Sequence, residues 1–147
     1  MRVSVIGGST VTDEEYEDAV AVGRLLAERG HTVVCGGLTG VMEAVAKGAS
    51  EADGDTIGII PMEERHHAND HVDTVIATGL GNARNVLVAL NGDAVIAVDG
   101  STGTLSEIGH ALDFERPVAG IRSHDVAGVE QVETPAEAVD YVEGAVS

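Results

Sequence analysis

The architecture of this chain follows most directly from the segment Ala94-Val95-Ile96-Ala97-Val98-Asp99-Gly100-Ser101-Thr102-Gly103-Thr104. Its first five residues form an unbroken apolar run, which is typical of a central strand in a parallel sheet covered by helices on both faces. A glycine-rich turn follows directly, and residues 104–114 then carry apolar side chains at helical spacing. A strand, a glycine turn and a helix in this order predict a βα unit of an α/β protein.

The same order repeats on both sides of this segment. Capping boxes predict helix starts at Thr12-Asp13-Glu14-Glu15 and at Thr134-Pro135-Ala136-Glu137. Further strands are predicted at residues 3–6, 32–35, 56–60, 72–77 and 118–121, further helices at residues 41–46 and 83–90, and a polar loop at residues 63–70. We therefore expect a single Rossmann-like α/β domain over residues 1–147, with a parallel sheet flanked by helices on both faces.

The charge of the chain is strongly acidic. Its 147 residues include 25 Asp and Glu against 8 Lys and Arg, a net charge of −17. Phosphate backbones are held by clustered Lys and Arg, so nucleic acid is not an expected partner. The acids are spread along the chain, and Lys47 is the only lysine. Two interpretations remain open: the surface of a protein from a halophilic host, which we favour, or a surface for basic partners.

The composition indicates a cytoplasmic protein. Hydrophobic residues make up 44% of the chain, enough for a core without disulfides. No run approaches the ~18 consecutive apolar residues of a membrane span, and the start Met1-Arg2-Val3 has no signal-peptide pattern, so no membrane association is expected. The single cysteine, Cys35, excludes an internal disulfide and a multi-cysteine zinc site, and it fits a reducing compartment.

The candidate ligand site is formed by three glycine-rich junctions between a strand and a helix, at residues 7–10, 36–40 and 100–104. Glycine lets backbone N–H groups turn inward, and the following helix adds its positive N-terminal end, so each junction is able to hold a phosphate. The alternative is that these turns need glycine for geometry alone. A Walker A loop and the GxGxxG fingerprint are both absent, so NAD is not expected and no resident cofactor is predicted. The candidate contacts to a phosphorylated ligand are Gly8, Ser9, Gly36, Gly37, Gly40, Gly100, Ser101, Thr102, Gly103 and Thr104.

Three motifs in the chain resemble the Lonely Guy family, Rossmann-like proteins long mislabelled lysine decarboxylases. Residues 36–49 are similar to the GGGxxGLM-type segment of that family, and residues 57–61 to its GIIP strand. Residues 99–107 are similar to its PGGxGTxxE loop, although Asp99 stands in place of the proline and Ser101 in place of the second glycine. The resemblance runs from about residue 3 to residue 118.

This resemblance implies a function and two catalytic residues. Characterised members cleave the N-glycosidic bond of cytokinin nucleoside 5′-monophosphates, and a close branch contains molybdenum-cofactor carrier proteins that bind without catalysis. Arg84 and Glu107 match the catalytic arginine and glutamate of the family, whereas the Arg84-Asn85 pair is more similar to the carrier branch than to the Arg-Lys of the enzymes. The expected function is that of a phosphoribohydrolase for a nucleoside 5′-monophosphate or, alternatively, a binding protein for a nucleotide or a pterin-type phosphorylated cofactor.

The resemblance also implies a homodimer, in which the stripe Val86, Leu87 and Leu90 is a plausible contact. A carboxylate at Glu107 would stabilise oxocarbenium charge on a sugar, and a guanidinium at Arg84 would orient a phosphate.

Structural roles remain open for both residues. Thr104-Leu105-Ser106-Glu107 is itself a capping box, and Arg84 alternatively is a solvated residue at a helix start.

Three histidines in the polar segment, His66, His67 and His71, have no standard metal-ligand spacing. We favour a loop that covers a substrate, and no metal is predicted. Cys35 and Met42 are expected in the core.

Overall fold

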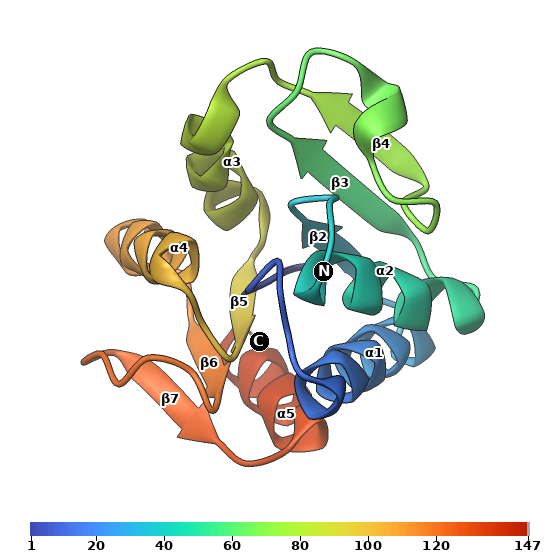
Figure 1. Ribbon diagram of the computed structural model, residues 1–147. Coiled ribbons are helices and arrows are strands. Elements are labelled where there is room, and N and C mark those ends of the chain that lie inside the picture. Colours follow the sequence, from blue (N-terminus) through green and yellow to red (C-terminus); the bar gives the residue numbers. More distant parts are fainter. Residues whose placement is uncertain (147) are drawn as a thin grey trace.

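One parallel sheet organises the protein. The computed structural model describes residues 1–146, in which seven parallel strands are arranged in the order β4-β3-β2-β1-β5-β6-β7 (Figure 1). The strands are β1 (Arg2–Gly7), β2 (Thr32–Cys35), β3 (Thr56–Ile60), β4 (Thr74–Ala77), β5 (Ala94–Val98), β6 (Val118–Ile121) and β7 (Val129–Val132). The helices are α1 (Asp13–Glu28), α2 (Val41–Glu51), α3 (Arg84–Asn91), α4 (Thr102–Asp113) and α5 (Pro135–Val146).

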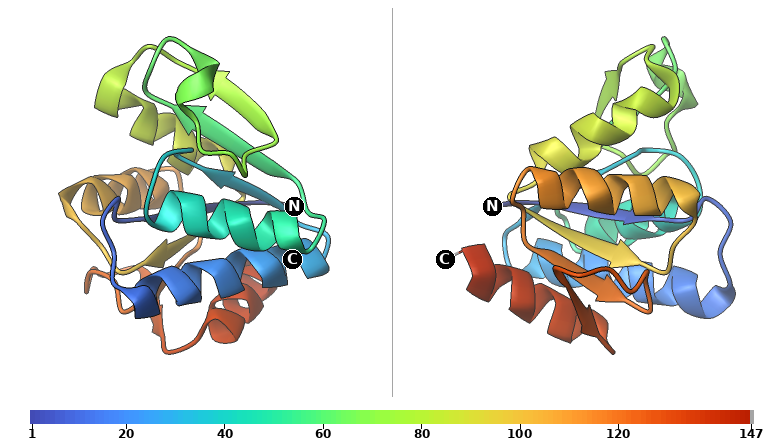
Figure 2. Two further views of the ribbon diagram at one scale, coloured as in Figure 1. Left: turned by 45° about the vertical axis from the view of Figure 1, so that its right-hand side comes forward. Right: turned by 90° about the vertical axis from the view of Figure 1, so that its left-hand side faces the viewer.

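Helices cover both faces of this sheet. α1, α2 and α5 pack on one face, and α3 and α4 pack on the other (Figures 1 and 2). Each face has its own apolar cluster, and the alternating side chains of β5 divide between them: Ile96 belongs to the cluster of the first face and Val95 to that of the second. The predicted fold class, a Rossmann-like parallel sheet between two helical layers, is confirmed.

The strand β5 has the environment that its composition predicts. All five of its residues are completely buried, and it pairs with β1 through a register that places Val5 opposite Ile96. The chain moves outward from β1 to β4 and then returns to β5 on the other side of β1. The loops after β1 and β5 therefore lead to helices on opposite faces, which leaves a crevice where doubly wound sheets bind ligands.

Two elements differ from the sequence prediction. The edge strand β7 was not predicted, because Glu130 and Gln131 at its centre are exposed and interrupt the apolar pattern. The helix α4 begins at Thr102 rather than at Thr104, and Ser101 is its N-cap residue. The interpretation of Thr104 as the N-cap is therefore wrong; Thr104 is the third helical residue.

Several large apolar side chains remain exposed on α3, on α4 and in the segment between β4 and α3. Leu90 on α3 and Leu105 on α4 are 40% and 44% exposed, and Leu80 before α3 is 54% exposed. Such side chains suit a contact between subunits, and the homodimer stays a prediction. Within residues 1–146, no helix has the length and apolar character needed to cross a bilayer.

The acidic surface predicts a dependence of stability on salt. We expect the melting temperature to rise as KCl increases from about 0.1 M to beyond about 1 M, because screening weakens the repulsion within a molecule of net charge −17. Replacing the exposed Glu17 and Glu28 of α1 with Gln should reduce the slope of that rise. A melting temperature that stays flat over this range would contradict the halophilic interpretation and favour a basic partner.

Candidate functional site

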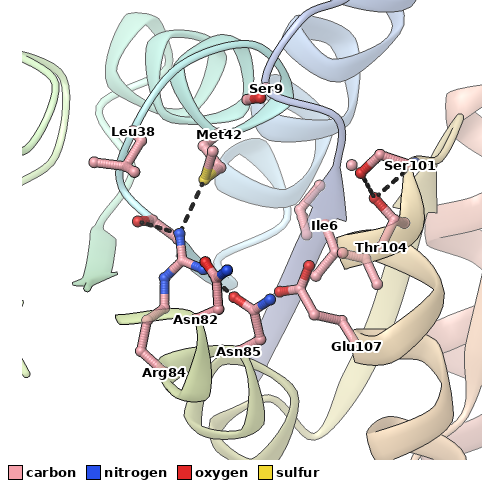
Figure 3. Close-up of a pocket in the computed structure, with 14 residues that line it drawn as sticks. Ile6, Ser9, Leu38, Met42, Asn82, Arg84, Asn85, Ser101, Thr104 and Glu107 are labelled. Atoms are coloured by element: carbon pink, nitrogen blue, oxygen red, sulfur yellow. Dashed lines mark hydrogen bonds between the residues drawn. The ribbon is translucent and has the colours of Figure 1, made fainter. Parts of the chain in front are cut away.

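A cavity of about 210 Å³ opens at the carboxyl end of the sheet, where β1, β2 and β5 meet their loops (Figure 3). Four parts of the chain form its walls: the end of β1, the loop from β2 into α2, the start of α3 and the start of α4. The residues that line it are Val5, Ile6, Gly7, Ser9, Gly36, Leu38, Met42, Asn82, Arg84, Asn85, Ser101, Gly103, Thr104 and Glu107.

The N-terminus of α4 is the wall best suited to an anion. The first turn of α1 carries three acidic residues, Asp13, Glu14 and Glu15, and none of them lines the cavity. The first turn of α2 carries Glu43. The first turn of α4 carries no acidic residue, and Gly103 and Thr104 from that turn line the cavity. The positive end of the α4 dipole is thus available to a ligand phosphate.

At the start of α4, Ser101 and Thr104 hold each other in place. The hydroxyl of Thr104 accepts a hydrogen bond from the backbone N–H of Ser101 at 3.3 Å, and the two hydroxyl oxygens lie 3.4 Å apart. This bond fixes the turn from β5 into α4. It leaves the hydroxyl of Ser101, in an exposed residue, at the rim of the cavity.

Glu107 lies one turn further along α4, and its carboxylate points into the cavity (Figure 3). The residue is only 8% exposed, and within residues 1–146 its carboxylate makes no hydrogen bond or ion pair. Burial raises the pKa of Glu107 to about 7, although the positive charge of Arg84 works in the opposite direction. The interpretation of Glu107 as a capping residue is wrong, because the cap of α4 is formed by Ser101 and Thr104.

Arg84 lies across the cavity from α4 and is buried, with 7% of its surface exposed. Its Nε donates to the carbonyl oxygen of Ile59 at 2.9 Å, and its Nη2 donates to that of Gly36 at 3.4 Å. Burial lowers the pKa of Arg84, while the charge of Glu107 opposes this shift. A solvated arginine at a helix start is therefore excluded.

Gly36 is required for this position of Arg84. A Cβ at residue 36 would lie 2.7 Å from Nη2 of Arg84 and 2.6 Å from the sulfur of Met42. Only glycine lets the guanidinium lie against the loop after β2. The close approach explains why a glycine follows directly after the buried Cys35.

Asn85 separates the two charged residues. Its Oδ1 accepts a hydrogen bond from Nη1 of Arg84, and the other end of its amide faces Glu107 (Figure 3). The side chain is neutral and 9% exposed. Glu107 therefore has an amide, and not a second cation, as its nearest neighbour on the α3 side of the cavity.

The carboxyl group of Asp99, in the loop from β5 to α4, is turned away from the cavity. Asp99 has a left-handed backbone with φ of 51°, and its Oδ1 approaches Gly8. Burial raises the pKa of Asp99 to about 7, helped by a hydrogen bond with Glu15. The negative charge beside the phosphate loop is thus reduced near neutral pH and directed toward the start of α1.

The structure brings seven of the twelve predicted site residues to the cavity. These are Ser9, Gly36, Arg84, Ser101, Gly103, Thr104 and Glu107. The other five do not line the cavity: Gly8, Gly37, Gly40 and Gly100 lie in the loops, and Thr102 is the first residue of α4. A Cβ at Gly40, for example, would lie 2.2 Å from the carbonyl oxygen of Gly8, so the close approach of two loops requires this glycine.

Sequence reasoning missed part of the lining. Asn82 belongs to none of the motifs, Leu38 lies within the segment 36–49 but is not among the predicted contacts, and Met42 is expected in the core alone. Met42 belongs to the core cluster of α1, α2 and α5 and also reaches the cavity, where its sulfur lies 3.7 Å from Nη2 of Arg84. The available signal is that Met42 is the second residue of a helix that begins directly after a glycine loop.

The histidine segment forms no metal-binding cluster. Across residues 1–146, no group of three or more His, Cys, Asp or Glu side chains is placed to hold a metal ion. His66 pairs with Glu64 at 3.2 Å, and the backbone N–H of His71 donates to Asn69 at 3.0 Å. A short 3-10 helix, Arg65–His67, lies within this segment.

The fold and the motifs together match a known family: the model of the SLOG cluster4 family covers residues 1–146. The chain belongs to this family. A protein of Archaeoglobus fulgidus is 44% identical over 142 residues, which cover 96% of this chain and 93% of that protein.

Two further similarities point to different functions. A cytokinin riboside 5′-monophosphate phosphoribohydrolase of Mycobacterium tuberculosis is 37% identical over 98 residues, which cover 65% of this chain and only 52% of that enzyme. A molybdenum cofactor binding protein of Rippkaea orientalis is 33% identical in sequence and superimposes with a TM-score of 0.94. That similarity covers 99% of this chain and 97% of the solved one.

The raised pKa of Glu107 predicts a stability that depends on pH. Between its ordinary value of 4.5 and its folded value of about 7, the folded state binds more protons than the unfolded state, so the contribution of Glu107 to stability falls as the pH rises. Glu107→Gln should therefore raise the unfolding free energy by about 2–3 kcal/mol at about pH 8 and by little at about pH 5.

Chemical denaturation of both proteins in about 1 M KCl measures this difference. Glu130→Gln, at an exposed residue of β7, is the matched control and should behave as the wild type at both pH values. An equal effect of Glu107→Gln at both pH values would contradict a carboxyl group that is protonated by burial.

Proposed function

We propose that this protein binds a small phosphorylated ligand of the pterin-cofactor or nucleotide class without breaking it down. The observation that carries this proposal is the arrangement Arg84–Asn85–Glu107. Arg84 is occupied by two main-chain carbonyls and by Asn85, and Glu107 faces a neutral amide. The family resemblance places a lysine at position 85 in the hydrolytic enzymes, and that second cation is missing here. The similarity to a molybdenum cofactor binding protein over nearly the whole of both chains supports the same proposal.

The phosphate of the ligand would bind at the start of α4. Backbone N–H groups of Gly103 and Thr104 and the hydroxyl of Ser101 supply donors there, at the positive end of the helix dipole. Arg84 on the opposite wall adds a positive charge that is fixed in place by Ile59 and Gly36. With its pKa near 7, the carboxyl group of Glu107 is partly protonated at neutral pH and able to donate a hydrogen bond to an oxygen of the ligand.

A second candidate function, hydrolysis of an N-glycosidic bond, is favoured by the pKa of Glu107. A group with a pKa near the working pH is well placed for general base catalysis. In that reaction Glu107 would accept the proton of a water whose oxygen bonds to C1′ of the ribose. The N-glycosidic bond would break, and the base would leave with the electron pair and take up a proton. Similarity to a phosphoribohydrolase over about half of that enzyme supports this candidate.

The two candidates differ in a simple assay. The wild type is incubated with AMP, GMP, CMP and UMP in about 1 M KCl, free base is measured by chromatography, and binding is measured by calorimetry. We expect binding of a phosphorylated compound and no release of base. Release of base that is abolished by Glu107→Gln would contradict the binding function and establish the hydrolase.

A matched pair of variants tests the phosphate site itself. Gly103→Asp places a carboxylate in the first turn of α4, where a Cβ meets no atom closer than 3.8 Å. Gly109→Asp places the same group later on this helix, where a Cβ meets nothing within 4 Å. We expect Gly103→Asp to weaken the binding of ribose 5-phosphate at least about tenfold by repulsion, and Gly109→Asp to leave it unchanged. Equal affinities for the two variants would overturn the assignment of the phosphate to α4.

A further inference from the structure

The cavity at the carboxyl end of the sheet is too small for the whole ligand. Its volume is about 210 Å³, whereas pockets that enclose drug-sized ligands begin at roughly 300 Å³. A nucleoside monophosphate or a pterin phosphate bound at α4 must therefore extend beyond this cavity. The direction in which it extends decides which residues recognise its ring.

A second cavity, of about 400 Å³, adjoins the first across Leu38. It lies between the start of α2 and residues 61–71, the segment that contains the histidines. Leu38 lines both cavities and so forms their common wall. The second cavity is lined by Leu38, Thr39, Glu43, Met62, His67, Asn69 and Asp70.

Asn69 holds the two sides of the second cavity together. Its side-chain amide donates to the carbonyl oxygen of Leu38 at 2.9 Å, and its backbone N–H donates to that of Gly37 at 2.9 Å. Its side-chain oxygen accepts from the backbone N–H of His71 at 3.0 Å. The histidine segment is thus tied directly to the glycine loop that forms the wall of the first cavity, so both cavities keep a fixed separation.

The polar groups in the second cavity have a defined chemistry. Glu43 and Asp70 contribute carboxylates, and the lining contains no Lys or Arg, so a second phosphate is disfavoured there. One oxygen of Glu43 accepts the hydroxyl proton of Tyr16 at 3.0 Å, which fixes the direction of its carboxylate. Leu38 and Met62 add apolar surface against which a flat ring can pack.

We propose that this second cavity is the subsite for the heterocycle of the ligand, and that Glu43 and Asp70 select a ring edge carrying adjacent N–H donors. The 2-amino-4-oxopyrimidine edge, shared by guanine and pterins, has two such donors, and a carboxylate accepts both. Adenine offers an amino group next to a ring nitrogen that is itself an acceptor, which a carboxylate repels. The proposal rests on the proposed function, because it takes the phosphate to be bound at α4.

Calorimetry with four compounds in about 1 M KCl tests this subsite. Ribose 5-phosphate reports the phosphate site alone, whereas GMP, AMP and 6-hydroxymethylpterin monophosphate add different rings. We expect at least about tenfold tighter binding of GMP or the pterin phosphate than of AMP, and the tighter of the two identifies which ring the site prefers. IMP, which lacks the 2-amino group, should bind more weakly than GMP.

The double variant Glu43→Gln with Asp70→Asn is expected to lose this preference while binding ribose 5-phosphate as the wild type does. Gln at position 43 keeps an oxygen that can accept from Tyr16, so the fold is preserved. Glu63→Gln, an exposed residue of the same segment that does not line the second cavity, is the control and should keep the preference.

Each outcome has one meaning. Binding of ribose 5-phosphate with equal affinities for GMP and AMP would overturn the subsite and leave the phosphate site intact. Failure of all four compounds and of IMP to bind would overturn the proposed function and, with it, the subsite. A preference for GMP that survives in the double variant would place ring recognition elsewhere.

Discussion

The buried guanidinium of Arg84 is the interaction on which the candidate site depends. A buried charge is unfavourable unless it is hydrogen-bonded. The buried guanidinium of Arg84 donates to two carbonyl oxygens, that of Ile59 in β3 and that of Gly36 directly after β2. These bonds tie α3 to β3 and to the loop after β2. Because the loop also carries Leu38, the position of Arg84 sets the walls of both cavities.

The charge around Arg84 follows from the same packing. Glu107 is buried across the cavity, but Asn85 lies between the two residues and uses its amide oxygen for Arg84. Arg84 therefore lowers the pKa of Glu107 less than burial raises it. The cavity thus combines a fixed cation, a carboxyl group that titrates near neutrality and the start of α4, whose first turn carries no acidic residue. This combination suits an anionic ligand with polar groups beside its phosphate.

Much of the fold could be predicted from the sequence because β1 and β2 end at glycine turns and β5 and β6 are wholly buried. β5 is the clearest case, since five apolar residues in a row are consistent with a strand covered on both faces. β7 could not be predicted, because an edge strand with Glu130 and Gln131 exposed carries little apolar pattern. The cap of α4 was misplaced because Ser101 and Thr104 are both good capping residues, and only the backbone geometry distinguishes them. Leu38 and Asn82 reach the cavity through loop conformation, which no local pattern encodes.

The central claim is that the start of α4, facing Arg84, holds the phosphate of the ligand. A crystal structure of the protein with ribose 5-phosphate, grown in about 1 M KCl, tests it most directly. The phosphate is predicted to lie within hydrogen-bond distance of the backbone N–H groups of Gly103 and Thr104, with the sugar directed toward Glu107. A phosphate bound at the start of α1 or α2, with the first turn of α4 empty, would contradict the account.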